Sequence, residues 1–183
     1  HGAGRSHYLT AVTEVDNKLV QIIDVEKVFS EISPVDETVS ESVKEKAKDI
    51  DFKDYTVLVA DDSAVARNQV KRALSTIGIH VETVNDGRLA LNWLEAKAQE
   101  LGGDISAKVP LIISDIEMPE MDGYTLTAEV KANEHLRHVH IILHSSLSGV
   151  FNEAMVKKVG ADQFIAKFHP DELVSAVQQW MNS

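Results

Sequence analysis

Residues 56–78 decide the fold, and they read TVLVADDSAVARNQVKRALSTIG. The short apolar run from Thr56 to Ala60 predicts a buried strand. The stretch from Ser63 to Ile77 repeats apolar residues at helical spacing, and Gly78 predicts where that helix ends. The inward residues of this helix would be Ala66, Val70, Leu74 and Ile77. A buried strand followed at once by an amphipathic helix is typical of an α/β domain with a parallel sheet.

The same alternation continues to the end of the chain. Four further strands are predicted at His80 to Val84, Leu111 to Asp115, Val139 to His144 and Gln163 to Ala166. Helices would follow the capping residues Asp86 and Asp122 and would begin at Phe151 and at Pro170. Five strands alternating with five helices predict a doubly wound, five-stranded parallel sheet with helices on both faces.

The composition limits the kinds of molecule with which the chain is expected to interact. Of the 183 residues, 44% are hydrophobic and 26% are charged, and the formal net charge is −11. A strongly negative chain is a poor partner for nucleic acid, whose phosphates need clustered Lys and Arg. No apolar run approaches the length of a bilayer, so we expect no membrane insertion. The sequence contains no Cys, which suits a reducing cytoplasm.

The first 33 residues form a separate small piece. Tyr8 to Val15 and Leu19 to Ile23 flank a turn at Asp16-Asn17 and predict a hairpin. Asp24 would then cap a short helix whose apolar residues are Val25, Val28, Phe29 and Ile32. A hairpin with one helix cannot bury its own apolar face. We therefore interpret residues 1–33 as the end of a domain that starts upstream, in agreement with the non-initiator residue His1.

Residues 34–54 are polar and mixed in charge, which is typical of a linker. The segment is either solvated or a connecting helix. Its apolar residues Val39, Val43, Ala47 and Ile50 lie at intervals of four, four and three. This spacing favours a helix with one narrow apolar stripe. The domain that follows would then span residues 55–183.

Polar residues gather at the carboxyl ends of the predicted strands. Right-handed crossovers place all these ends at one edge of the sheet, which is where such sheets bind ligands. Asp61 and Asp62 follow the first strand, Asp115 ends the third, Ser145 follows the fourth and Lys167 follows the fifth. The sequence therefore predicts three carboxylates, a hydroxyl and an ammonium on one rim.

These groups suit phosphoryl transfer to a carboxylate. Three neighbouring carboxylates require a cation, and oxygen ligands without His or Cys favour Mg²⁺. A carboxylate can also act as a nucleophile and form an aspartyl-phosphate. The ammonium of Lys167 and the hydroxyl of Ser145 would then contact the phosphoryl oxygens.

Together these residues resemble the receiver domains of two-component response regulators. The most specific match is the run of residues 115–123, DIEMPEMDG, directly after the third strand. The resemblance implies a flavodoxin-like receiver fold in which Asp115 is phosphorylated by a histidine kinase and in which dephosphorylation is slow, so that the domain is a regulator and not an enzyme. It also implies a Mg²⁺ site and a switch. The metal ligands would be Asp62 and Asp115 directly, Asp61 through water and the backbone carbonyl of Glu117, and the switch residues Ser145 and Phe164.

Two features depart from the receiver pattern. Lys167 is followed by Phe168-His169-Pro170, whereas the family usually places Pro directly after its Lys. The segment from Glu95 to Val109 is also longer than in typical members, and no role is assigned to it.

Residues 8–32 carry a second resemblance, to the closing segment of a CheW-like coupling domain. A CheW-like domain followed by a receiver is the arrangement of CheV-type chemotaxis coupling proteins. This resemblance implies a cytoplasmic protein that receives phosphate from the chemotaxis histidine kinase. Its CheW-like part would contact the chemoreceptor–kinase complex.

The sequence is also compatible with other functions. A haloacid-dehalogenase-type phosphohydrolase also uses a nucleophilic Asp, but it needs a second Asp two residues later, where this chain has Glu117. The receiver could instead regulate another upstream module, such as a DNA-binding one, or serve only as a phosphate sink. Four histidines between residues 135 and 144 could suggest a metal cluster, but we interpret them as scattered surface or strand-edge residues.

Overall fold

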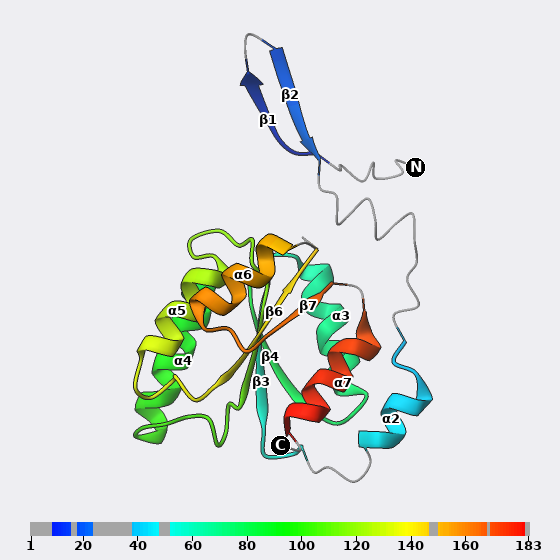
Figure 1. Cartoon of the computed structure of the whole chain (residues 1–183), viewed down its shortest axis with the longest axis vertical. Helices are drawn as coiled ribbons and strands as arrows, with labels where there is room; N and C mark the ends of the chain where they lie inside the picture. Colours follow the sequence, from blue (N-terminus) through cyan, green and yellow to red (C-terminus); the bar gives the residue numbers. More distant parts are fainter. Residues whose placement is uncertain are drawn as a thin grey trace, which may run out of the picture. The chain divides into compact units, whose positions relative to one another are not determined.

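The chain forms two compact units, His1–Asp36 and Glu37–Ser183. The computed structural model describes residues 9–15, 18–23, 38–47, 52–146, 150–167 and 169–181 (Figure 1). Within these residues, no helix is both long enough and apolar enough to cross a membrane.

The N-terminal unit contains an antiparallel hairpin of β1 (Leu9–Val15) and β2 (Lys18–Ile23). Val15 pairs with Lys18, which agrees with a hairpin at the expected place, whereas residues 16 and 17 lie outside the described residues. The short helix expected after Asp24 lies outside the described residues.

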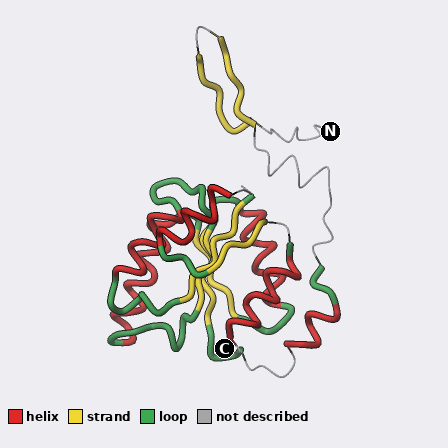
Figure 2. The backbone as a smooth tube through the Cα atoms, in the orientation of Figure 1, coloured by secondary structure: helices red, strands yellow, loops and turns green. Residues whose placement is uncertain are grey.

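The second unit is built on a five-stranded parallel sheet (Figure 2). The strands are β3 (Thr56–Ala60), β4 (His80–Val84), β5 (Leu111–Ser114), β6 (His140–Ser145) and β7 (Gln163–Ala166). Their order is β4-β3-β5-β6-β7, with β3 and β5 in the interior. The strand order reverses between β3 and β5, which places a ligand crevice beyond their carboxyl ends.

Helices cover both faces of this sheet, as expected for a doubly wound fold (Figure 1). They are α3 (Ala64–Ser75), α4 (Gly87–Leu101), α5 (Gly123–Ala132), α6 (Val150–Val159) and α7 (Pro170–Met181). The side chains of Ser63, Asp86 and Asp122 accept backbone N–H groups in the first turns of α3, α4 and α5.

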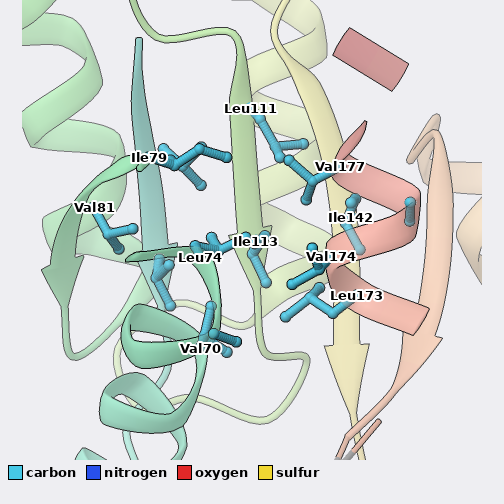
Figure 3. Close-up of a cluster of buried hydrophobic side chains, with 14 of the residues drawn as sticks. Val70, Leu74, Ile79, Val81, Leu111, Ile113, Ile142, Leu173, Val174 and Val177 are labelled. Carbon is cyan, nitrogen blue, oxygen red and sulfur yellow. The ribbon is translucent and has the colours of Figure 1, made fainter. Parts of the chain in front are cut away.

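One hydrophobic cluster lies between the sheet and helices α3 and α7 (Figure 3). Val70 and Leu74 of α3 and Val174 of α7 meet Ile113 and Ile142 from the central strands. A second cluster lies on the opposite face under α4, α5 and α6. The two clusters bury the strands on both sides, which explains why the strands are continuously apolar.

Helix α2 (Glu41–Ala47) lies in the segment that the sequence assigns to the linker. It belongs to the same compact unit as the sheet, which begins at Glu37. Val39 and Val43 are buried in the cluster formed by α3 and α7. The compact unit that contains the sheet therefore includes residues before position 55.

Three predicted strand boundaries, in two strands, are wrong by one residue. The strand expected to end at Asp115 ends at Ser114, and the strand expected from Val139 to His144 runs from His140 to Ser145. Asp115 therefore lies just beyond its strand, while Ser145 is the last residue of its own.

The long segment after Glu95 divides into the end of α4 and an ordered loop. Helix α4 ends at Leu101, and the left-handed residue Gly102 caps it. In the loop, Ile105 is fully buried, and its N–H donates to the carbonyl of His135 at 3.2 Å. The carbonyl of Lys108 accepts the N–H of Thr56 at 2.9 Å. The additional residues thus close the amino-terminal edge of the sheet.

Candidate functional site

The carboxyl end of β3 carries the first two acids. Asp61 is buried, and its Oδ1 accepts the N–H of Ser63 at 2.8 Å. This bond turns the Asp61 carboxylate back over the start of α3. Asp62 is exposed, but its ligand oxygen lies within 4.8 Å of those of Asp61 and Asp115.

Asp115 follows β5, the central strand, and is 5% exposed. Its N–H donates to the carbonyl of Ala60 at 2.7 Å, which holds it beside the end of β3. Its own Oδ1 accepts the N–H of Ile116 at 2.7 Å. The backbone around Asp115 therefore orients the carboxylate towards Asp61 and Asp62.

Lys167 connects this central acid to Asp61. Its Nζ lies 3.0 Å from Asp61 Oδ2 and 3.1 Å from Asp115 Oδ2, and the residue is 4% exposed. Its backbone N–H donates to the carbonyl of Ser145 at 3.0 Å. The Phe168-His169-Pro170 sequence after Lys167 therefore does not prevent the ammonium from reaching both carboxylates, although Phe168 itself lies outside the described residues.

The environment of Asp115 raises the pKa of its carboxyl to about 7. Burial is the largest cause, because it penalises the charged form. Lys167 opposes this effect, and the neighbouring charge of Asp61 adds to it. The Asp115 carboxyl therefore takes up a proton at a higher pH than an ordinary Asp does.

The remaining predicted site residues are Ser145, Phe164 and Glu117, and each lies on a different element. Ser145 is buried at the end of β6, in register with Ala166 on β7. Phe164 is half-buried on β7 and packs against the cluster under α4, α5 and α6. The side chain of Glu117 is exposed in the loop after Asp115.

Sequence reasoning missed Arg67. Its side chain is hydrogen-bonded to the backbone of the two acids that follow β3. Its Nη1 donates to the carbonyl oxygens of Asp61 at 2.6 Å and of Asp62 at 3.0 Å. Helical side chains point towards the N-terminus of their helix, so an Arg in the first turns of α3 can reach back to the preceding loop. That direction is the signal that could have identified Arg67.

Gly123, the last residue of the DIEMPEMDG run, has a steric role. A Cβ at Gly123 would overlap the carbonyl oxygen of Asp115. Its N–H donates to the carbonyl of Ile116 at 2.9 Å. The start of α5 thus packs directly on the backbone of the central acid, and only Gly allows this approach.

The histidines do not form a metal site. Among the described residues, Asp61, Asp62 and Asp115 are the group of acids and histidines close enough to hold a metal ion. The ring of His140 stacks on that of Trp180 at 5.0 Å between centroids. His144 was expected at the surface or a strand edge, but it is buried. Burial and the charges of Lys167 and His169 lower its pKa to about 3.

The acidic group fits a hard divalent cation. Its three carboxylates offer oxygen ligands alone, and the single ammonium of Lys167 leaves an excess of negative charge. Mg²⁺ is commonly bound in this way, through one or two carboxylates and several waters.

This sheet order, with three acids and a buried Lys at its carboxyl edge, defines the class of CheY-like receiver domains. Comparison with known families agrees. Residues 57–178 match the family described as the response regulator receiver domain, and the chain belongs to this family.

The similar proteins include chemotaxis proteins. The chain is 30% identical to chemotaxis protein CheV1 of Helicobacter pylori over 98% of its own length and 54% of that protein. It is 29% identical to CheV3 of the same organism, over 93% of the chain and 54% of that protein. The chain thus spans about half the length of these relatives.

The solved structure of chemotaxis protein CheY4 from Vibrio cholerae is also similar. It shares 32% identity and a TM-score of 0.58, and the match covers 68% of the chain and 97% of CheY4. The CheY4 match thus covers about two thirds of the chain, whereas the CheV1 match covers nearly all of it.

Proposed function

We propose that the chain takes a phosphoryl group from a histidine kinase on Asp115 and acts as a regulator, not as an enzyme with a separate substrate. The observation that carries this proposal is the contact of Lys167 Nζ with both Asp61 and Asp115 beside a third carboxylate. A buried ammonium at this position can stabilise the charge that develops on a transferred phosphoryl group.

In the proposed reaction, a carboxylate oxygen of Asp115 attacks the phosphorus of a phosphohistidine. The P–N bond breaks, the imidazole leaves with the electron pair and takes up a proton, and an acyl phosphate forms on Asp115. Lys167 and the hydroxyl of Ser145 contact the phosphoryl oxygens. Slow attack by water later releases inorganic phosphate and restores the carboxylate.

The proposed metal is Mg²⁺, held by Asp61, Asp62, Asp115 and the backbone carbonyl of Glu117. When bound, it supplies positive charge that neutralises the phosphoryl oxygens. The role of the chain is to present the carboxylate and carbonyl oxygens that bind the metal, and to hold them on fixed loops. Arg67 supports this by anchoring the carbonyls of Asp61 and Asp62.

The proposed readout uses Ser145 and Phe164. Ser145 would move towards the phosphoryl group, and Phe164 on the neighbouring strand would respond by changing its packing. The register of β6 with β7 supports this, because Leu143 pairs with Phe164 and Ser145 pairs with Ala166. Local contacts of this kind are how a new charge is converted into a change of surface.

We also propose a role in chemotaxis, as a cytoplasmic CheV-type coupling protein. The similarity to CheV1 and CheV3 extends over more than nine-tenths of the chain, which includes residues N-terminal to the receiver. The N-terminal unit would be the end of a CheW-like domain that contacts the chemoreceptor–kinase complex.

The test of the phosphoacceptor is Asp115→Asn, incubated with Mg²⁺ and a small phosphodonor such as phosphoramidate. Intact-mass measurement should show one added phosphoryl group on the unmodified chain and on the exposed control Asp54→Asn, and none on Asp115→Asn. An unchanged phosphorylation stoichiometry in Asp115→Asn would contradict the assignment.

A further inference from the structure

Helix α2 is docked on α7, the last helix of the receiver. Val39 and Val43 are 3% and 7% exposed, and they share a hydrophobic cluster with Leu173 and Val177 of α7. The two helices lie side by side in Figure 1. This docking removes apolar side chains from water and keeps the segment before β3 on the receiver.

Two hydrogen bonds attach the docked segment to α7. The N–H of Ser40 donates to Asp171 Oδ1 at 2.7 Å, and Gln178 Nε2 donates to the carbonyl of Val43 at 3.0 Å. Asp171 and Gln178 are seven residues apart, so they lie on one face of α7, two turns from each other. Gln178 is buried, which makes this hydrogen bond costly to lose.

The attachment point lies a short distance along the chain from the phosphoacceptor site. Lys167 precedes Asp171 by only four residues, and its Nζ contacts Asp115. Pro170 begins α7, and the N–H of Leu173 donates to the carbonyl of His169 at 3.0 Å. Only residues 168–170 separate Lys167 from Asp171, and the carbonyl of His169 is hydrogen-bonded to the first turn of α7.

A phosphoryl group on Asp115 would add oxygen atoms next to Lys167. Lys167 Nζ is already at contact distance from the Asp115 carboxylate, and the residue is almost fully buried. New oxygens on Asp115 would occupy the space beside Nζ, so we expect the Lys167 side chain to shift. Closely packed interiors transmit such shifts instead of absorbing them.

We propose that α2 is a phosphorylation-sensitive clasp, held on α7 when Asp115 is unmodified and released when it is phosphorylated. The proposal rests on the function proposed above for Asp115. The shift of Lys167 moves the start of α7 and weakens the bond between Asp171 and Ser40. Because α2 is the first described element after the N-terminal unit, its release converts a docked segment into a free tether.

The first experiment measures hydrogen exchange of residues 39–47 with and without Mg²⁺ and beryllium fluoride, which mimics the phosphoryl group. We expect exchange to rise at least about fivefold on addition, the lower end of typical coupling between two sites. Fluorine NMR of the bound beryllium fluoride reports occupancy separately. No binding contradicts the phosphoacceptor function, whereas binding with unchanged exchange in residues 39–47 overturns only the clasp.

The second experiment uses the reciprocity of linked equilibria. Val43→Asp removes the docking, so it should tighten beryllium fluoride binding by the same factor, while the exposed control Lys46→Asp should not. Conversely, the pair Ser40→Cys and Asp171→Cys can lock the clasp, and the chain has no other Cys. Weaker beryllium fluoride binding in the oxidised than in the reduced pair is expected. Equal affinities in the two forms would overturn the proposal.

Discussion

Lys167 Nζ lies 3.1 Å from Asp115 Oδ2, and both residues are almost fully buried. The ammonium also lies 3.0 Å from Asp61 Oδ2. It is therefore a counter-ion shared by two acids that follow different strands. The removal of a buried counter-ion leaves charge that the surroundings cannot solvate. The Lys167–Asp115 pair therefore contributes to the stability of the fold and lies at the residue proposed to accept phosphate.

We expect Lys167→Met to destabilise the metal-free chain by about 3 kcal/mol, the usual cost of breaking a buried pair. Urea unfolding measures this loss. Mg²⁺ should restore part of the stability, because it replaces the missing positive charge. The exposed control Lys71→Met should unfold at the same urea concentration as the original chain, and an unchanged midpoint in Lys167→Met would show that Asp61 and Asp115 do not need the ammonium.

Arg67→Ala should weaken Mg²⁺ binding by about tenfold, a typical effect of losing a group that orients metal ligands. Arg67 donates to the backbone carbonyls of Asp61 and Asp62. The fold should therefore survive while the ligand geometry loosens. Calorimetric Mg²⁺ titration tests this, with the exposed residue of the same helix in Lys71→Ala as control. Equal affinities in the two variants would mean that the loop keeps its shape without Arg67.

The stability of the chain should fall as the pH drops from about 6.5 towards about 3, in part because of His144. Burial lowers the pKa of His144 in the folded state to about 3, from an ordinary value of 6.5. Between these values the unfolded chain binds a proton that the folded chain does not, so stability rises with pH. The stabilising contribution is complete above about 6.5 and is lost as the pH approaches about 3.

His144→Leu should flatten this pH dependence, whereas the exposed His135→Leu should leave it unchanged. Urea midpoints at several pH values between 4 and 8, on the same buffer series, give the comparison. An identical pH slope in His144→Leu and in the original chain would contradict the assignment to His144.

Gly123→Ala should destabilise the chain by about 1–3 kcal/mol, as overpacking usually does. In an open helix this change would be favourable, because Ala has the higher helix propensity. Here the new Cβ would meet the carbonyl oxygen of Asp115. Thermal unfolding measures the loss, with Glu129→Ala on the exposed side of α5 as control. A gain in stability would show that the start of α5 can move away from Asp115 at little cost.

Local patterns were sufficient to predict the elements of the receiver. Strand and helix periodicity identified β3 and α3 from residues 56–78, and the caps Asp86 and Asp122 were recognised from residue type alone. Of the three strand boundaries that were wrong by one residue, those at Ser114 and Ser145 lie where the strand meets the site. There the backbone leaves the ladder to orient polar groups, and no periodicity marks that point.

The sequence by itself determined that Asp61, Asp62, Asp115 and Lys167 share one edge, because parallel strands with right-handed crossovers all end on the same side. Only the tertiary structure decided which groups touch. Lys167 contacts both Asp61 and Asp115, and Ser40 is hydrogen-bonded to Asp171, although these residues are far apart in the chain. The burial of His144 likewise depends on elements that are distant in sequence. Such contacts depend on the side-chain packing between elements, which the pattern of any one segment does not encode.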